Sequence, residues 1–135
     1  MSPLFAKLNL GTHRRILVLD APASFEPELG LLGDVEIRRS ARGLRTIDFA
    51  IAFATRRVDV DRLGALVLPR AADDAIVWFA YPKASSRTYR CDFNRDIGWS
   101  VLEAAGFETV RAVAIDADWS ALRFRRARHV RHRPA

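Results

Sequence analysis

The sequence from residue 15 to residue 20 is Arg-Ile-Leu-Val-Leu-Asp, and residues 21–25 are Ala-Pro-Ala-Ser-Phe. A short apolar run that ends in an acid is typical of the buried parallel strand that opens a nucleotide-binding α/β sheet. Such a strand normally leads into a glycine-containing loop, because the backbone must approach the ligand there and enter a helix. Residues 21–25 contain no glycine. The segment therefore predicts the sheet better than it predicts a ligand.

Further segments along the chain have the pattern of an α/β protein. Residues 47–54 are almost continuously apolar, which is typical of a central parallel strand covered on both faces. Ser24, Asp59 and Asn94 are suited to cap helices that follow the strands. The pattern predicts a three-layer sheet of about six mostly parallel strands, ending in an antiparallel hairpin. The other predicted strands are Val35–Arg38, Ala75–Tyr81, Glu108–Ile115 and Leu122–Arg126.

Length and composition indicate a single globular domain over residues 1–135, with a core of about 15–126 and a basic tail of about 127–135. No apolar run approaches the ~18 residues of a membrane span, so no membrane association is predicted. The start of the chain lacks a secretory signal pattern. The one cysteine, Cys91, can form no internal disulfide, which favours a reducing cytoplasm.

The net charge of +6 is concentrated at the end of the chain. Basic terminal arms bind nucleic acid mainly through phosphates, so association through this tail is one hypothesis. A solvated tail and an oligomer contact are the alternatives. The arginines of the last thirteen residues, which contain no acid, are Arg123, Arg125, Arg126, Arg128, Arg131 and Arg133.

Three stretches of the sequence carry a family resemblance. They are Leu17-Val18-Leu19-Asp20-Ala21-Pro22, the segment from Trp78 to Ser86, and the segment from Asp116 to Phe124. Through these stretches the chain resembles a small bacterial family of unknown function with a class I methyltransferase-like, Rossmann-like topology. The resemblance implies this fold and a bacterial origin, but it implies no activity. Whether the protein is an enzyme stays open.

Several residues disfavour a site for S-adenosylmethionine (SAM), although they do not exclude an atypical one. The usual glycines are missing. Glu26 and Glu28 would repel an anion from the first helix. Methyl-donor sites commonly place an acid at the end of the second strand, where this chain has Glu36 one position early and then Arg38 and Arg39. Asp20 is the one strand-end carboxylate positioned to touch a ligand, and capping the next turn is its alternative role.

The loop from Tyr81 to Arg95 offers the other candidate ligand site. Lys83, Ser85, Ser86 and Arg87 are suited to hold phosphate or carboxylate, because cationic forks and hydroxyls donate to such anions. A solvated loop with internal ion pairs is the alternative, and a catalytic Ser–Lys pair is a further one. The leading hypothesis is a non-catalytic domain that binds a small anion or a protein partner. The alternative hypothesis is a SAM-dependent methyltransferase with an atypical cofactor loop.

The remaining polar residues point to structural roles. Asp116 and Asp118 are two residues apart without a nearby histidine, so turn formation is favoured over metal binding and no metal is predicted. Neighbouring arginines could lower the pKa of the Cys91 thiol, although a lone loop cysteine is usually incidental. An open sheet has exposed strand edges, which a second copy of the chain can cover, so a homodimer is a further hypothesis.

Overall fold

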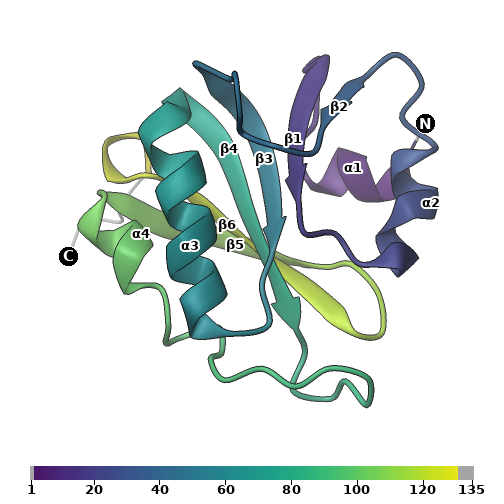
Figure 1. The fold of residues 1–135 in the computed structure, drawn as a ribbon, viewed down its shortest axis with the longest axis vertical. Helices are drawn as coiled ribbons and strands as arrows, with labels where there is room; N and C mark the ends of the chain where they lie inside the picture. Colours follow the sequence, from purple (N-terminus) through teal and green to yellow (C-terminus); the bar gives the residue numbers. More distant parts are fainter. Residues whose placement is uncertain (1, 131–135) are drawn as a thin grey trace.

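The computed structural model describes residues 2–130, which form one six-stranded sheet with short helices on both faces (Figure 1). The strands lie in the order β2-β1-β3-β4-β6-β5. Their bounds are β1 Arg15–Leu19, β2 Glu36–Arg38, β3 Ile47–Phe53, β4 Ala71–Pro82, β5 Phe107–Ala114 and β6 Trp119–Arg126. The helices are α1 Pro3–Lys7, α2 Glu26–Leu29, α3 Arg57–Val67 and α4 Ser100–Ala104, with 3-10 turns at Ala23–Phe25, Leu68–Arg70 and Ala127–His129.

The strand directions confirm the predicted mostly parallel sheet and its terminal hairpin. β1 pairs in parallel with both β2 and β3, and β3 pairs in parallel with β4. β6 is antiparallel to both β4 and β5, so β5 runs in the direction of β4. The carboxyl ends of β1, β3 and β4 therefore meet at one edge of the sheet, which is the edge where ligands of open α/β sheets bind.

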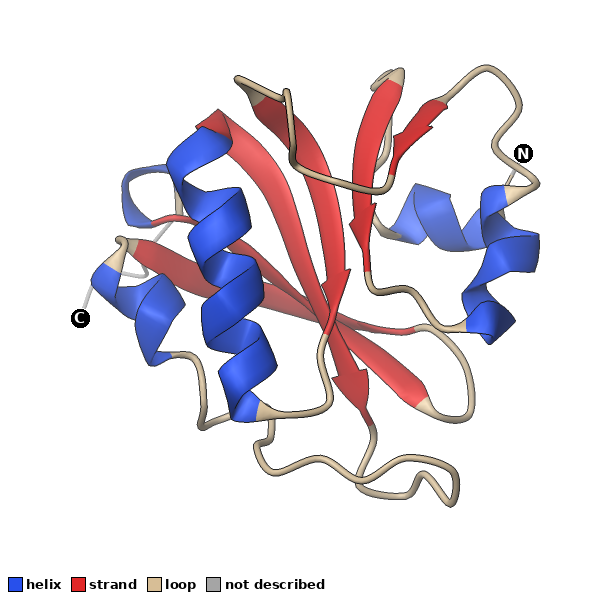
Figure 2. Cartoon of the chain, in the orientation of Figure 1, coloured by secondary structure: helices blue, strands red, loops and turns tan. Residues whose placement is uncertain are grey.

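One face of the sheet is covered by α3 and α4 (Figure 2). On α3, Val60, Leu63 and Val67 are fully buried, and their spacing of three and four residues forms one helical face. Leu102 of α4 and Phe124 of β6 belong to the same apolar cluster. This packing explains why the β3 and β4 sequences are apolar on both sides: each has helices or loops above and below.

The opposite face is covered by α1 and by the segment that follows β1. Phe5 and Leu8 at α1 pack with Phe25, Phe49 and Trp78 in a second apolar cluster. The indole Nε1 of Trp78 donates a hydrogen bond to the carbonyl of Leu8 at 2.8 Å. This bond joins the chain start to the central strand β4 across 70 positions of sequence.

The helix predicted to begin at Ser24 is only a short segment in the structure. A 3-10 turn and the four residues of α2 replace it, and Ser24 makes no capping hydrogen bond. Pro22 and Pro27 lack backbone N–H groups, and Gly30 has a low helix propensity, so the segment has few hydrogen bonds to extend a helix. The second predicted cap is also wrong, because α3 begins at Arg57 and Asp59 lies inside its first turn.

The third predicted helix cap, Asn94, organises a loop instead. Its Oδ1 accepts hydrogen bonds from the N–H groups of Asp96 and Ile97 at 2.8 and 3.1 Å, which is a side-chain-supported turn. Ile97, in this turn, is 60% exposed, so it does not form the apolar face of a helix that begins at Asn94. Gly98, with φ of 104°, separates this loop from α4.

The predicted basic tail, 127–135, lies only partly within the described residues. The turn Ala127–His129 follows β6 directly, and residues 131–135 of the predicted tail lie outside the described residues. Among residues 2–130, no helix is long and apolar enough to cross a membrane.

Candidate functional site

The carboxyl edge of the sheet is organised around β1 and β3, where the chain leaves toward opposite faces. After β1, Phe25 and Leu29 pack into the cluster on the α1 side. After β3, Val60 and Leu63 of α3 pack into the cluster on the other side. Ligands of open α/β sheets bind where neighbouring connections diverge in this way, outside the carboxyl ends of the strands.

Asp20 lies at this point, directly after β1. Its backbone has φ of 58°, a left-handed conformation that glycine adopts freely and that aspartate tolerates better than most residues. Its Oδ2 accepts a 2.6 Å hydrogen bond from Nη2 of Arg62, which comes from α3. This hydrogen bond is the main cause of the raised pKa of Arg62. The pair thus joins the β1 end to the helix that follows β3, and it places a carboxylate beside a guanidinium.

A second ion pair joins the ends of β1 and β2. Arg39, just after β2, donates to both carboxylate oxygens of Glu26 at 2.9 and 2.7 Å. This hydrogen bonding lowers the pKa of Glu26 and raises that of Arg39. Glu26 therefore supplies an ionised carboxylate near the end of β2, where Arg38 and Arg39 are the last residue of the strand and the one that follows it. The sequence pattern could not indicate that Glu26 lies near the end of β2, because Glu26 is thirteen residues from Arg39.

A cavity of about 480 Å³ lies farther along the same edge, at the end of β4. Its walls include the aromatic rings of Tyr81 and Phe93, and Lys83 and Arg95 are also among its lining residues. None of the lining residues is acidic; the remaining ones are Pro82, Ala84, Cys91, Asn94 and Ser120. Lys83 is half-buried, and it forms no ion pair with the residues that the structure describes. The cavity is therefore apolar in its walls and positively charged.

Of the loop residues predicted to bind an anion, only one lines the cavity. Lys83 lines the cavity, whereas Ser85 and Arg87 are exposed and are not among its lining residues. Ser86 supports the loop: its hydroxyl donates to Oδ1 of Asp118 at 2.8 Å and accepts from the N–H of Tyr89 at 3.1 Å. Asp20 lies at a different strand end. Arg95, at the end of the predicted loop, also lines the cavity. The aromatic walls from Tyr81 and Phe93 were missed, because their proximity depends on the path of a long loop.

The other candidates have structural surroundings. Oδ1 of Asp116 accepts from the N–H groups of Asp118 and Trp119, each at 2.8 Å, which is the turn that the sequence predicts. Within residues 2–130, no three His, Cys, Asp or Glu side chains are grouped to hold a metal ion. Burial raises the pKa of the Cys91 thiol, which is opposite to the direction expected from its neighbouring arginines.

A larger cavity, of about 560 Å³, lies at the amino ends of β1 and β2. Its lining includes Phe5, Leu10 and Leu31 together with His13 and Asp34. The site residues predicted from sequence do not line it, and its mixture of charges favours no class of ligand. Size alone does not place the functional site there, because ligands of this kind of sheet bind at the carboxyl edge.

The strand order, the antiparallel β6 and the carboxyl-edge site define a class I methyltransferase-like fold. No family profile matches the sequence, and no curated protein sequence matches it. Among solved structures, the chain is similar to a SAM-dependent methyltransferase from Aquifex aeolicus, with a TM-score of 0.58 and 15% identity, covering 90% of this chain and 86% of that one.

Two other similar structures extend this comparison. Magnesium protoporphyrin IX methyltransferase from Synechocystis PCC 6803 with bound SAH has a TM-score of 0.58 and 10% identity, covering 92% of this chain and 78% of that one. The N-methyltransferase NodS from Bradyrhizobium japonicum WM9 has a TM-score of 0.57 and 11% identity, covering 90% and 91%. At these identities the likeness shows the fold, and it confirms the methyltransferase-like topology that the sequence resemblance implies.

These neighbours correct two predictions made from the sequence. The interpretation as a non-catalytic binding or interaction domain is wrong, and so is the argument that disfavoured SAM, because structures of this fold include methyltransferases solved with SAM or SAH bound. The physical reason lies in the first loop. Asp20 takes the left-handed turn that a glycine would normally supply, so the missing glycines do not prevent the chain from turning there.

Gly98 provides a test of the loop that forms the β4 cavity. Its φ is 104°, and a Cβ added there would lie 2.7 Å from Cβ of Phe93, a cavity residue. Gly98→Ala is expected to lower the free energy of unfolding by about 1–3 kcal/mol, through strain and this clash, in a urea titration. Gly106→Ala is the matched control, because Gly106 has φ of 86° but no atom near the added Cβ. Equal losses in both variants would contradict the clash.

Proposed function

We propose that this protein is a SAM-dependent methyltransferase with an atypical, glycine-free cofactor loop. The observation that carries the proposal is the Asp20–Arg62 pair at the point where the chain leaves β1 and β3 in opposite directions. The methyltransferase-like fold supports it, since proteins of this fold bind SAM or SAH in solved structures. The single cysteine is consistent with a cytoplasmic location as part of the same proposal.

The residues at the edge suit the chemical groups of the cofactor. The amino acid end of SAM carries an ammonium and a carboxylate, which Asp20 and Arg62 would respectively hold. Glu26 would accept hydrogen bonds from ribose hydroxyls, and Arg39 keeps its carboxylate ionised and oriented. When bound, SAM supplies an activated methyl group. The chain's contribution would be to bind and orient the two reactants.

The β4 cavity is the proposed site of the methyl acceptor. β1 and β4 are two strand spacings apart, or about 10 Å, so the two sites are neighbours on one edge. The aromatic walls from Tyr81 and Phe93 suit an apolar body, and Lys83 and Arg95 suit an anionic group on it. The proposed acceptor is therefore a small amphipathic anion.

A thermal-shift comparison tests this function. SAM and SAH are each expected to raise the melting temperature saturably, by several degrees at ~100 times Kd, where binding adds about 2.7 kcal/mol. ATP and methionine serve as ligand controls, because each carries only part of the cofactor's chemistry and should give smaller shifts. The proposal would be contradicted if ATP raised the melting temperature as much as SAH does. It would also be contradicted if neither SAM nor SAH raised the melting temperature.

A further inference from the structure

Three arginines are grouped on the α1 side of the sheet, away from the carboxyl edge. Arg111 of β5 and Arg123 of β6 are direct partners in the strand register, and Arg125 is two residues farther along β6. Since side chains alternate along a strand, Arg123 and Arg125 share one face. Contacts with Trp78 and with Asn9, which follows α1, place this face on the α1 side.

The three guanidinium groups have different partners. Arg125 is neutralised by Asp74, to which it donates two hydrogen bonds at 2.6 and 2.7 Å. Arg111 donates to the carbonyl of Lys7, and its Cζ lies 6.0 Å from the Trp78 ring centroid. Both partners of Arg111 are uncharged.

Arg123 is the least satisfied of the three. Its Nη1 is 3.4 Å from Oδ1 of Asn9, and its buried Nε has no hydrogen-bond partner. Burial is the main cause of its lowered pKa, to which repulsion from Arg125 and Arg111 adds and which Asp74 opposes. Two like charges directly opposite each other across a strand pair destabilise the sheet. Among residues 2–130, neither Arg111 nor Arg123 forms an ion pair with a carboxylate.

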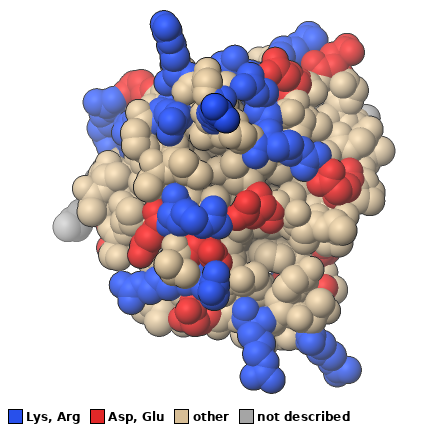
Figure 3. Space-filling view, in the orientation of Figure 1, with Lys and Arg blue, Asp and Glu red and all other residues tan. Residues whose placement is uncertain are grey.

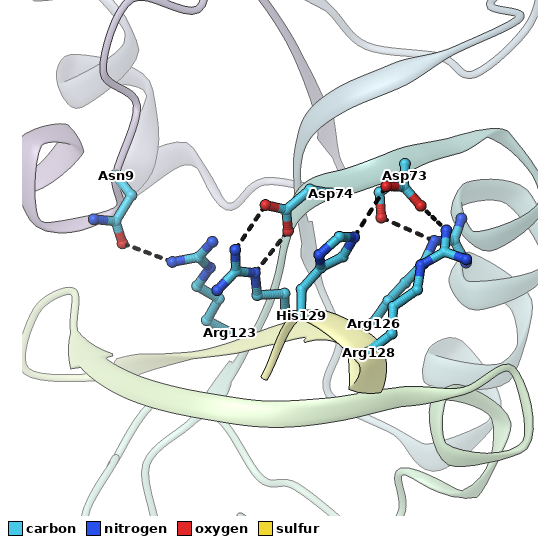
Figure 4. Close-up of polar contacts among 8 residues, drawn as sticks. Asn9, Asp73, Asp74, Arg123, Arg126, Arg128 and His129 are labelled. Atoms are coloured by element: carbon cyan, nitrogen blue, oxygen red, sulfur yellow. Dashed lines mark hydrogen bonds and ion pairs between the residues drawn. The ribbon is translucent and has the colours of Figure 1, made fainter. Parts of the chain in front are cut away.

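The neighbouring basic residues do not offer the same opportunity. Arg128 and His129 both pair with Asp73 (Figure 4). Arg126 donates to the carbonyl oxygens of Ala71 and Asp73. On the face that carries α3, basic and acidic side chains lie together in the middle of the view, and basic ones predominate toward its upper edge (Figure 3). Among the arginines of β5, β6 and the turn Ala127–His129, Arg111 and Arg123 therefore face each other without a neutralising carboxylate or a full set of hydrogen-bond acceptors, and an added anion would relieve their repulsion.

We propose that Arg111 and Arg123 form a binding site for a phosphoryl group, separate from the methyl-transfer site. Two guanidinium groups present several N–H donors from neighbouring strands, and a phosphoryl group has enough oxygens to accept from both at once. The exposed ammonium of Lys7 lies at the adjacent end of α1 and adds attraction. The phosphoryl group could belong to a small phosphate ester or to a nucleic acid backbone.

Titration with inorganic phosphate at constant ionic strength, with chloride replacing it in the reference, tests this site. The melting temperature of the wild-type protein is expected to rise saturably in the millimolar range. Arg111→Gln, at an exposed side chain, and the double variant with Arg123→Gln are expected to raise the apparent Kd at least about 10-fold. No phosphate-specific rise in the wild type, or an unchanged Kd in folded Arg111→Gln, would overturn the proposal.

The matched control is Arg57→Gln, an exposed arginine on α3 at the other face. An equal loss in this variant would mean general charge attraction and would also overturn the proposal. Asp20→Asn should keep the phosphate response, because Asp20 belongs to the other site. Fluorescence anisotropy of a labelled single-stranded RNA then identifies the source of the phosphoryl group. If the RNA binds more tightly than inorganic phosphate, and the double variant loses this binding, the source is a nucleic acid. If the RNA binds more weakly than phosphate, the source is a small ester.

Discussion

Replacing Trp78 with alanine is expected to lower the free energy of unfolding by about 3–5 kcal/mol. The side chain is fully buried in β4 and packs in the cluster that includes Phe5 and Phe49. Truncation would leave a cavity between the sheet and α1 and would remove the hydrogen bond to Leu8. Small domains have a free energy of unfolding of only about 5–15 kcal/mol, so the expected loss is a large fraction of the total stability. Urea denaturation followed by circular dichroism measures the loss.

Two variants separate the contributions of Trp78. Trp78→Phe keeps most of the volume but leaves the buried Leu8 carbonyl without its donor, so a loss of about 1–3 kcal/mol is expected. Val58→Ala is the control, because Val58 is 58% exposed on α3 and should change stability by less than about 0.5 kcal/mol. A loss below about 1 kcal/mol in Trp78→Ala would show that α1 is not held in this way.

The second large effect is on cofactor affinity. Asp20→Asn and Arg62→Leu are each expected to weaken SAH binding by about 10- to 100-fold, because each removes a charge-assisted hydrogen bond of about 1.5–3 kcal/mol. Asparagine tolerates the left-handed backbone at position 20, so Asp20→Asn tests the charge rather than the turn. Titration calorimetry with SAH measures both variants.

Protein stability separates binding from folding in this experiment. The Asp20 and Arg62 side chains are 49% and 51% exposed, and exposed ion pairs contribute about 0–1 kcal/mol, so the variants should unfold almost like wild type. Arg57→Leu, an exposed substitution on the same helix, should leave SAH affinity unchanged. Unaltered affinity in both Asp20→Asn and Arg62→Leu would place the cofactor elsewhere.

Much of the fold could be predicted from local pattern. The apolar runs at β1, β3 and β4 are strong signals, because each strand is covered on both faces and carries few polar residues. Helix starts were predicted less well. Asn94 shows why: its side chain satisfies the N–H groups of a turn, and the same chemistry caps helices.

The candidate site was less visible in the sequence. Asp20 and Lys83 could be found because they directly follow apolar strands. Arg62, which contacts Asp20 from 42 residues away, had no local signal. The missing glycines misled the functional interpretation, because a motif records the usual residue for a conformation, while Asp20 reaches that conformation without it.

Isothermal titration of the wild-type protein with SAH tests the central claim most directly. The methyltransferase proposal predicts a saturable isotherm with one site per chain, and competition by SAM for that site. The absence of binding heat and of competition with SAH at up to ~1 mM, in a protein shown to be folded, would contradict the proposal. A Kd above ~1 mM corresponds to a binding free energy weaker than about −4 kcal/mol.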